Sequence, residues 1–148
     1  MEIERKFLID QRPTDIDSYA YHIIEQAYLC TDPVIRVRKE DDHYYMTYKG
    51  KGLMAREEYN LPLNRAAYEQ LKPKAEGNLI SKKRVLIPYQ KYTIELDIFS
   101  EPFAPLLLAE VEFESEEDAL AFLPPDWFGQ DVTNDPQYHN SNMSRRTF

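Results

Sequence analysis

Short segments of alternating charged and apolar residues recur along nearly the whole chain, and this period of two constrains the fold more than any other feature. In a β-strand, residues two positions apart share a face, so each segment has one apolar and one polar face. Turn-forming residues separate the segments, at Asp32-Pro33, Asp41-Asp42, Pro88-Tyr89-Gln90 and, more loosely, Gly50-Lys51-Gly52. The pattern predicts an antiparallel β protein.

Eight strands are expected, at Glu2–Ile9, Glu25–Thr31, Val34–Glu40, His43–Lys49, Ala55–Leu63, Ser81–Ile87, Lys91–Phe99 and Leu106–Glu114. An even number suits a closed up-and-down barrel, which leaves no strand edge exposed. The fold class is therefore mainly β, an eight-stranded antiparallel closed barrel with a few flanking helices. The chain has no repeat or linker, so one domain is expected over residues 1–148.

Helices are expected in four places between and after the strands. The first is a weakly amphipathic segment at Thr14–Ile24. Asn64 is a capping residue for a second helix that runs to about Leu71. Ser115 begins a capping-box pattern for a third, which ends before Pro124-Pro125. The fourth is a short helix in the polar tail from Pro136 to Ser144.

Composition and charge exclude several classes of protein. With 148 residues, 43% of them hydrophobic, the chain is large enough to bury a core without disulfides. No apolar run could span a bilayer, and no secretory signal is expected, so we expect no membrane partner. The single cysteine, Cys30, fits a reducing cytoplasm. A net charge of −8 argues against a nucleic-acid partner, because such proteins present a basic face.

The charged residues are sorted into acidic and basic pairs at a spacing of two. Acidic pairs are Glu2/Glu4, Glu95/Asp97 and Glu110/Glu112; basic or mixed pairs are Arg36/Arg38, Lys82/Arg84 and Arg56/Glu58, with Lys6 and Lys49 on similar faces. For any one strand, a solvated sheet face is the simplest explanation. The recurrence of such pairs on nearly every strand favours another. If the sheet closes with these faces inward, acids and bases line a single cavity, and the apolar faces turn outward under the helices.

Such a cavity has the chemistry to bind phosphate together with a metal. Carboxylate oxygens are the ligands of hard cations such as Mg²⁺ and Mn²⁺, and guanidinium groups match phosphate oxygens. The metal would then carry positive charge to the phosphate. The three histidines are isolated and have no zinc-site spacing.

The motifs resemble those of the CYTH superfamily, also called triphosphate tunnel metalloenzymes. Glu2-Ile-Glu4-Arg-Lys6 matches the Glu-x-Glu-x-Lys signature of that family. Further matches follow in order at Arg36-Val-Arg38, Thr47-Tyr-Lys49, Arg56-Glu-Glu58, Lys82-Lys-Arg84, Glu95-Leu-Asp97, Glu110-Val-Glu112, Trp127-Phe128-Gly129 and Asp131-Val-Thr133. The resemblance implies an eight-stranded tunnel that binds a triphosphate with two divalent ions, Mg²⁺ or Mn²⁺.

The resemblance also implies residue roles. Phosphate binding falls to Lys6, Arg36, Arg38, Lys49, Arg56 and Arg84, and metal binding to Glu2, Glu4, Asp97, Glu110 and Glu112, with Glu58 and Glu95 as further candidates. The tail around Tyr138 and Asn140 resembles the family's plug helix, which closes one tunnel mouth. Asn60 stands where many relatives carry a glutamate, which removes one carboxylate from the ligand set.

The compact chain most resembles tripolyphosphatase-type members, so hydrolysis of inorganic tripolyphosphate is the leading expectation. Lys82 is a candidate general base, because crowding by arginines would favour loss of its proton; its alternative role is a phosphate clamp. A nucleoside or thiamine triphosphatase, an adenylate cyclase, a polyphosphate-binding module without activity, and a plain barrel with solvated charges remain alternatives. The oligomeric state, monomer or homodimer, stays open.

Overall fold

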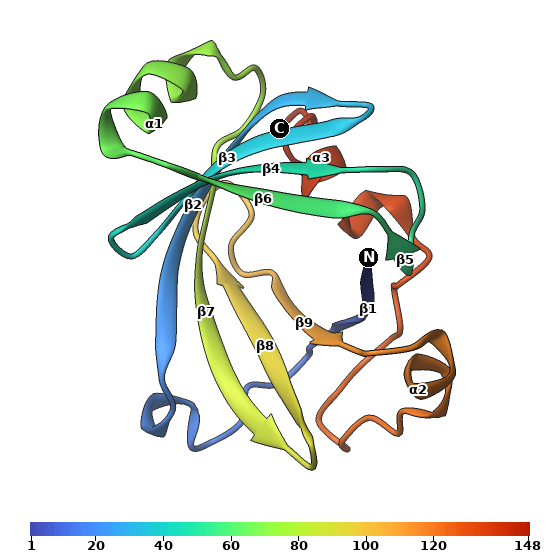
Figure 1. The fold of residues 1–148 in the computed structure, drawn as a ribbon. Coiled ribbons are helices and arrows are strands. Elements are labelled where there is room, and N and C mark those ends of the chain that lie inside the picture. Colours follow the sequence, from blue (N-terminus) through green and yellow to red (C-terminus); the bar gives the residue numbers. More distant parts are fainter.

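The computed structural model describes residues 1–148 as a single antiparallel sheet with short helices around it (Figure 1). The strands are β1 (Glu2–Leu8), β2 (Tyr21–Thr31), β3 (Val34–Glu40), β4 (His43–Lys49), β5 (Ala55–Arg56), β6 (Glu58–Leu63), β7 (Ile80–Tyr89), β8 (Tyr92–Phe99) and β9 (Leu107–Glu112). The helices are α1 (Arg65–Leu71), α2 (Glu116–Ala121) and α3 (Asn140–Met143), with 3₁₀ turns η1 (Ile16–Ser18), η2 (Lys72–Lys74) and η3 (Pro136–Tyr138). No helix is both long and apolar enough to cross a membrane.

The sheet wraps around into a nearly closed barrel. Its strand order is β5-β1-β9-β8-β7-β2-β3-β4-β6. The two end strands, β5 and β6, follow each other in the chain and are separated by Glu57 alone. One chain segment therefore pairs with β1 through Ala55 and Arg56, and with β4 through residues 58–63. This join brings the two ends of the sheet together, and it explains why nine strands are observed where eight were expected.

Two apolar clusters lie on the outer face of the barrel. The larger includes Leu96, Val111 and Phe122 and lies under α2 and the segment that follows it. A smaller one packs Ala27 and Val37 against Tyr68 of α1. In Figure 1, α1 and α2 lie on opposite sides of the wrapped sheet. The prediction that the apolar faces turn outward under helices is confirmed.

A third apolar cluster lies inside one end of the barrel. Ile80, Phe99 and Leu108 belong to it, and each is two residues from a charged residue on the same strand face. Met143 of α3 is fully buried in this cluster. The inside of the barrel is therefore charged along most of its length and apolar where α3 closes it.

Two of the helix predictions are confirmed at the level of their caps. The Asn64 side chain accepts a hydrogen bond from the Ala67 backbone N–H, and the Ser115 hydroxyl accepts one from the Asp118 N–H. Each cap satisfies an N–H group that the first helical turn leaves unpaired. The tail forms η3 and α3 within the predicted range 136–144.

The helix expected at Thr14–Ile24 is wrong. Only η1 forms there, and from Tyr21 the chain belongs to β2, where Tyr21–Gln26 pairs with Val85–Ile80 of β7. Ile24 is completely buried in this pairing, so tertiary packing overrides the weak helical pattern.

The hairpin predicted at Pro88-Tyr89-Gln90 is shifted. Pro88 and Tyr89 stay in β7, and Gln90-Lys91 forms the turn. Leu86 donates its backbone N–H to Ala20, which lies just before β2 begins. Pro88 lies two residues further along β7 and faces the same side as Leu86, but β2 does not extend that far. No strand residue lies opposite Pro88 on that side, so its missing N–H costs the sheet no hydrogen bond.

Truncation of Leu96 tests the placement of the core on the outer face. Leu96 is 0% exposed, so Leu96→Ala leaves a cavity and is expected to lower the free energy of unfolding by about 2–5 kcal/mol. Leu120 of α2 is 75% exposed, and Leu120→Ala is the matched control, with a change within about 0.5 kcal/mol. Urea unfolding followed by circular dichroism measures both. Equal losses in the two variants would contradict this placement.

Candidate active site

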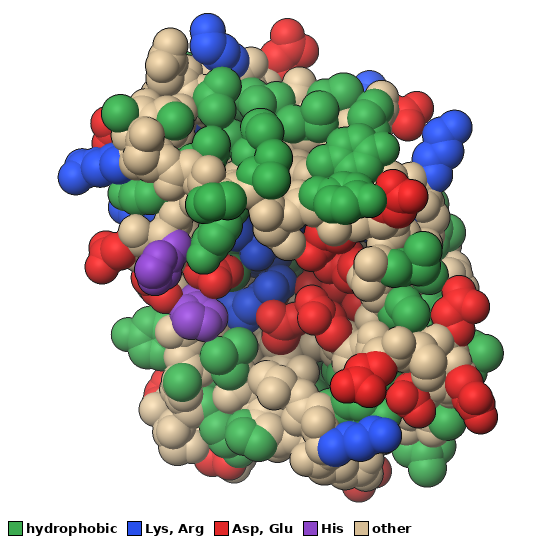
Figure 2. All heavy atoms as spheres, in the orientation of Figure 1, with side chains coloured by type: hydrophobic (Ala, Val, Ile, Leu, Met, Phe, Trp, Pro, Cys, Tyr) green, Lys and Arg blue, Asp and Glu red, His purple; other side chains and the backbone are tan.

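The interior of the barrel holds a cavity of about 250 Å³. Its lining is Glu2, Glu4, Lys6, Tyr28, Val34, Arg36, Arg38, Glu40, Tyr45, Thr47, Lys49, Arg56, Glu58, Asn60, Lys82, Arg84, Glu110, Glu112, Asn140 and Ser141. Figure 2 shows acidic and basic side chains gathered in a hollow on one face of the molecule. The inward orientation predicted for the charged strand faces is therefore observed.

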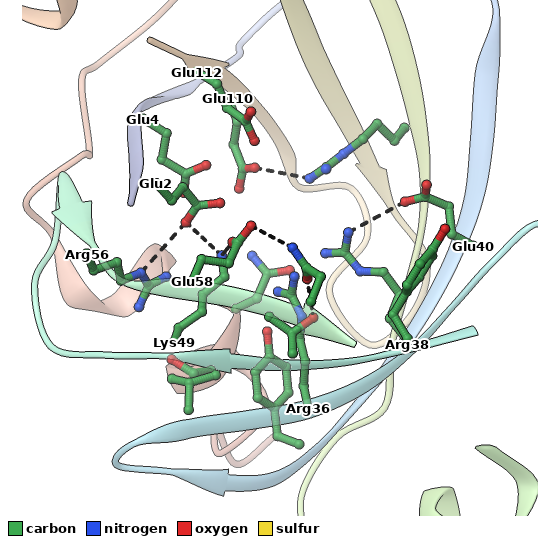
Figure 3. Close-up of a pocket in the computed structure, with 18 of the residues that line it drawn as sticks. Glu2, Glu4, Arg36, Arg38, Glu40, Lys49, Arg56, Glu58, Glu110 and Glu112 are labelled. Carbon is green, nitrogen blue, oxygen red and sulfur yellow. Dashed lines mark hydrogen bonds and ion pairs between the residues drawn. The ribbon is translucent and has the colours of Figure 1, made fainter. Parts of the chain in front are cut away.

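One part of the cavity wall is rich in carboxylates and another in arginines, and further basic side chains lie among the carboxylates. Carboxylates come chiefly from β1 and β9, and arginines from β3, and Figure 3 shows the two groups facing each other. The lining includes seven Lys or Arg residues and six Glu residues. The cavity is thus nearly neutral, although the chain carries a net charge of −8. A strongly charged anion in this cavity needs additional positive charge, which a metal ion can supply.

Arg84 is the most heavily bonded side chain of the site. Its Nε and Nη2 donate to the two carboxylate oxygens of Asp97 at 2.8 and 2.9 Å. The same guanidinium donates to Glu95 and to Glu110, each at 3.0 Å. Bidentate pairing of this kind fixes both partners in orientation as well as in charge. The structure therefore places Arg84 as the group that holds the carboxylates of β8 and β9.

Glu2, Glu4 and Glu112 form a carboxylate group suited to a metal ion. One oxygen from each lies within 4.8 Å of the others. Burial and the neighbouring Glu4 raise the pKa of Glu2 to about 8, even though Lys49 acts in the opposite direction. Burial and Glu4 likewise raise the pKa of Glu112. The nearby Lys49 does not offset burial and the repulsion between the carboxylates, and a divalent cation would stabilise their ionised form.

The structure does not bring the other predicted metal ligands into this group. Asp97 is 0% exposed, and its oxygens accept from Arg84 and, at 2.7 Å, from Lys82. Glu110 lies between Lys6 at 3.2 Å and Arg84 at 3.0 Å. Lys6 and Arg84 hold the pKa of Glu110 well below its usual range despite its burial. Glu95 belongs to a second depression outside the main cavity.

Glu58 lies beside the carboxylate group and is paired with other side chains. It accepts from Lys49 at 3.1 Å and from the Asn60 amide at 3.0 Å. Asn60 in turn accepts a hydrogen bond from Thr47 at 2.7 Å. Asn60 therefore serves to orient Glu58.

The basic wall includes groups that no carboxylate neutralises completely. Arg36 is 7% exposed, and its Nε is buried without a hydrogen-bond partner. Such a donor is costly unless a ligand accepts from it. Burial, together with Arg36 and Arg84, lowers the pKa of Arg38 to about 10. Lys49 and Arg56 both lie near Glu2, at 2.9 and 3.8 Å.

Lys82 is buried in the floor of the cavity, with 3% of its surface exposed. Burial lowers its pKa to about 7, with Asp97 opposing the shift and Arg84 adding to it. Removal from water is a larger cause of this shift than the crowding by arginines that the sequence predicts. An amine with this pKa can exist in neutral form near neutral pH.

The tail occupies the position predicted for a plug. The Lys6 ammonium donates to the Tyr138 carbonyl at 3.0 Å, and Lys82 donates to the Asn140 side chain at 2.9 Å. Asn140 and Ser141 both line the cavity. The tail therefore closes one end of the barrel and contributes to the site.

Sequence reasoning missed several residues of the site, among them Gln26, Tyr28, Glu40 and Tyr45. Gln26 and Tyr28 follow the same spacing of two as Arg36 and Arg38 but carry no charge. A search for charged pairs overlooks them. Their polar side chains, which follow the buried Ile24 on the same strand face, were the available signal.

An antiparallel barrel with an inward-facing set of acids and bases defines a protein that binds a polyanion within a tunnel. Residues 1–124 match the CYTH domain. The chain belongs to the CYTH family.

Known relatives cover nearly the whole chain. An inorganic triphosphatase from Nitrosomonas europaea is 40% identical over 148 residues, which is 97% of this chain and 96% of the relative. An inorganic triphosphatase from Acetivibrio thermocellus is 34% identical, over 99% and 95% of the two chains. The crystal structure of an inorganic triphosphatase superposes with a TM-score of 0.74 at 36% identity, covering 99% of this chain and 96% of the other.

Replacement of Glu112 tests the proposed metal site. Glu112→Gln removes one carboxylate of the group and should weaken Mn²⁺ binding by at least about tenfold, the loss seen even for residues that only support a ligand. Glu114, two residues further on, lies outside the group, and Glu114→Gln should bind Mn²⁺ as the unchanged protein does. Isothermal titration with Mn²⁺ measures both. Unchanged affinity in Glu112→Gln would contradict the assignment.

Proposed function

We propose that this protein hydrolyses a triphosphate, inorganic tripolyphosphate in particular, in a reaction that depends on a divalent metal ion. The observation that carries the proposal is the cavity, in which a basic wall faces a carboxylate group of metal-binding composition. Membership of the CYTH family supports the same activity. So does the similarity to two relatives named inorganic triphosphatase, which the chain matches over nearly their full length.

The size and lining of the cavity favour an inorganic substrate over an organic one. It measures about 250 Å³, and only Tyr28, Val34 and Tyr45 among its 20 lining residues are hydrophobic. A nucleoside or thiamine triphosphate needs a largely apolar pocket for its ring system. The plug closes the end of the barrel where apolar residues gather, and Met143 fills that space. A chain of phosphates, by contrast, is matched by charged groups along its whole length.

The basic residues have distinct roles in this proposal. Arg36 supplies the unpaired Nε, and Arg38, Lys49, Lys6 and Arg56 supply further donors to phosphate oxygens. Arg84 donates mainly to carboxylates; its contribution is to fix them while adding positive charge. Catalysis would then rest on positioning and on charge neutralisation, as in phosphoryl transfer generally.

Glu2, Glu4 and Glu112 are the residues that would hold a divalent ion, Mg²⁺ or Mn²⁺. When bound, the ion supplies positive charge to the phosphate oxygens, and a second ion is part of the proposal. The protein residues orient the triphosphate so that water attacks a terminal phosphorus in line. The bond to the bridging oxygen breaks, and pyrophosphate or another phosphate group leaves. Lys82 accepts the proton of the attacking water or, in the alternative role, binds a phosphate oxygen.

Phosphate release tests the activity and the choice of substrate together. Tripolyphosphate, ATP and thiamine triphosphate are each incubated with the protein in Mg²⁺ and in Mn²⁺, with a chelator as the control. We expect release from tripolyphosphate that stops when the metal is removed. Faster release from an organic triphosphate would replace the substrate assignment. Tight binding of tripolyphosphate without release from any of the three would make the protein a binding module instead.

Replacement of Lys82 separates its two proposed roles. Lys82→Met keeps the length of the side chain and removes the amine, so kcat should fall by about 10²–10⁴-fold with little change in KM if Lys82 is the general base. Lys83→Met is the matched control, because Lys83 points to the outer face, where its ammonium lies 4.3 Å from the Tyr21 ring centroid. Steady-state kinetics with tripolyphosphate measure both. A rise in KM as large as the fall in kcat would assign Lys82 to phosphate binding.

A further inference from the structure

Four side chains on different elements form a continuous chain of hydrogen bonds in the wall of the cavity. Arg38 of β3 donates from Nε and Nη2 to the Gln26 side-chain oxygen, at 3.0 and 2.8 Å. Gln26 of β2 donates from Nε2 to the Asn140 side-chain oxygen at 2.8 Å. The same Asn140 oxygen accepts from Lys82 of β7 at 2.9 Å. Gln26 is 0% exposed and Asn140 8% exposed, so water does not compete for these bonds.

The direction of every bond in this chain is set by Arg38. A guanidinium group has donors only, so the Gln26 oxygen must face it. The Gln26 NH₂ group therefore points the other way, where it donates to Asn140 and, at 3.2 Å, to the Tyr28 hydroxyl. Asn140 must then present its oxygen to Gln26, and this same oxygen meets Lys82. The amide orientations follow from chemistry and admit no alternative arrangement with all bonds kept.

The consequence for Lys82 is a fixed orientation of its amine. Asp97 and Asn140 accept from Lys82 at 2.7 and 2.9 Å, which uses two of the directions around the nitrogen. Lys82 also lines the cavity. The remaining direction belongs to the third N–H when the group is protonated and to the lone pair when it is neutral. In both states that direction is available to a bound substrate or water.

We propose that Asn140 of the plug helix α3 is a positioning residue, which acts through Lys82 and is itself oriented by Gln26 and Arg38. This inference rests on the proposed function, since it needs Lys82 to serve the reaction. The plug helix thus closes one end of the barrel and also positions a side chain of the site. Asn140 in the C-terminal tail and Gln26 on β2 together set the orientation of the Lys82 nitrogen toward the substrate.

Docking of the plug does not depend on Asn140 alone, which makes the proposal testable. Met143 is completely buried in the apolar end of the barrel. Asn78 donates its backbone N–H to Ser144 at 2.6 Å and its side-chain NH₂ to Arg146 at 2.7 Å. These contacts hold the helix from its other end, so removal of the Asn140 amide should leave the helix in place.

The experiment compares three variants of the full chain in tripolyphosphate hydrolysis. Asn140→Leu has a similar volume and no acceptor, and should lower kcat about 10- to 100-fold with KM within twofold, as expected for a misplaced catalytic group. Gln26→Glu still accepts from Arg38 but has no donor for Asn140, whose amide must turn and withdraw its oxygen from Lys82. It should therefore reproduce the same loss of kcat without any change in the helix. Asn142→Ala, at an exposed position of α3, should match the unchanged protein.

The double variant Gln26→Glu/Asn140→Leu distinguishes one shared chain from two separate defects. If both residues act through Lys82, the kcat of the double variant should be no lower than that of Asn140→Leu. Once the Asn140 acceptor is gone, the change at Gln26 removes no further contact from Lys82. Unchanged kcat in Gln26→Glu, multiplied losses in the double variant, or equal changes in kcat and KM would each overturn the proposal. Absence of hydrolysis by the unchanged protein would instead overturn the proposed function. Thermal unfolding shows whether Asn140→Leu remains folded, and Gln26→Glu decides the matter if it does not.

Discussion

The buried ion pairs around Arg84 are the constraint on which the rest of this structure depends. A barrel that turns its charged faces inward takes many ionised groups out of water, and each must find a partner or become neutral. Arg84 meets this requirement for three carboxylates on two neighbouring strands, and Lys82 and Lys6 complete the pairing of Asp97 and Glu110. Because the interior is charged, the apolar faces must pack outside, where α1 and α2 cover them.

Pairing is incomplete in two places, and these face each other across the cavity. The Arg36 Nε has no acceptor, and in the group of Glu2, Glu4 and Glu112 burial, followed by the neighbouring Glu4, raises the pKa of Glu2 to about 8. A phosphate anion would satisfy the first, and a metal cation the second. Desolvation makes unpaired charge in the cavity unfavourable. A metal ion bound together with a phosphate is favoured for the same reason, because the pair supplies a positive charge to the carboxylates and a negative charge to the arginine.

The prediction of inward-facing charged strands depended on local chemistry and was confirmed over most of the chain. Strand faces follow from a spacing of two, and the caps at Asn64 and Ser115 from side chains that satisfy nearby N–H groups. The predictions of secondary structure were wrong where residues distant in the sequence determine whether a segment forms a strand. The segment at Thr14–Ile24 enters a strand because β7 pairs with it. The break at Glu57 arises because one segment must reach both ends of the sheet.

By itself the sequence determined which residues share a strand face, that acids and bases are sorted along it, and that the chain resembles the CYTH family. Which acid meets which base was decided by the tertiary structure alone, because register and closure bring together residues that no local rule relates. Asp97 and Glu110 each pair with two cations, whereas in the group of Glu2, Glu4 and Glu112 only Glu2 has basic partners. Likewise Gln26 and Asn140, 114 positions apart, meet only because the tail enters the barrel, and burial then makes their hydrogen bond directional.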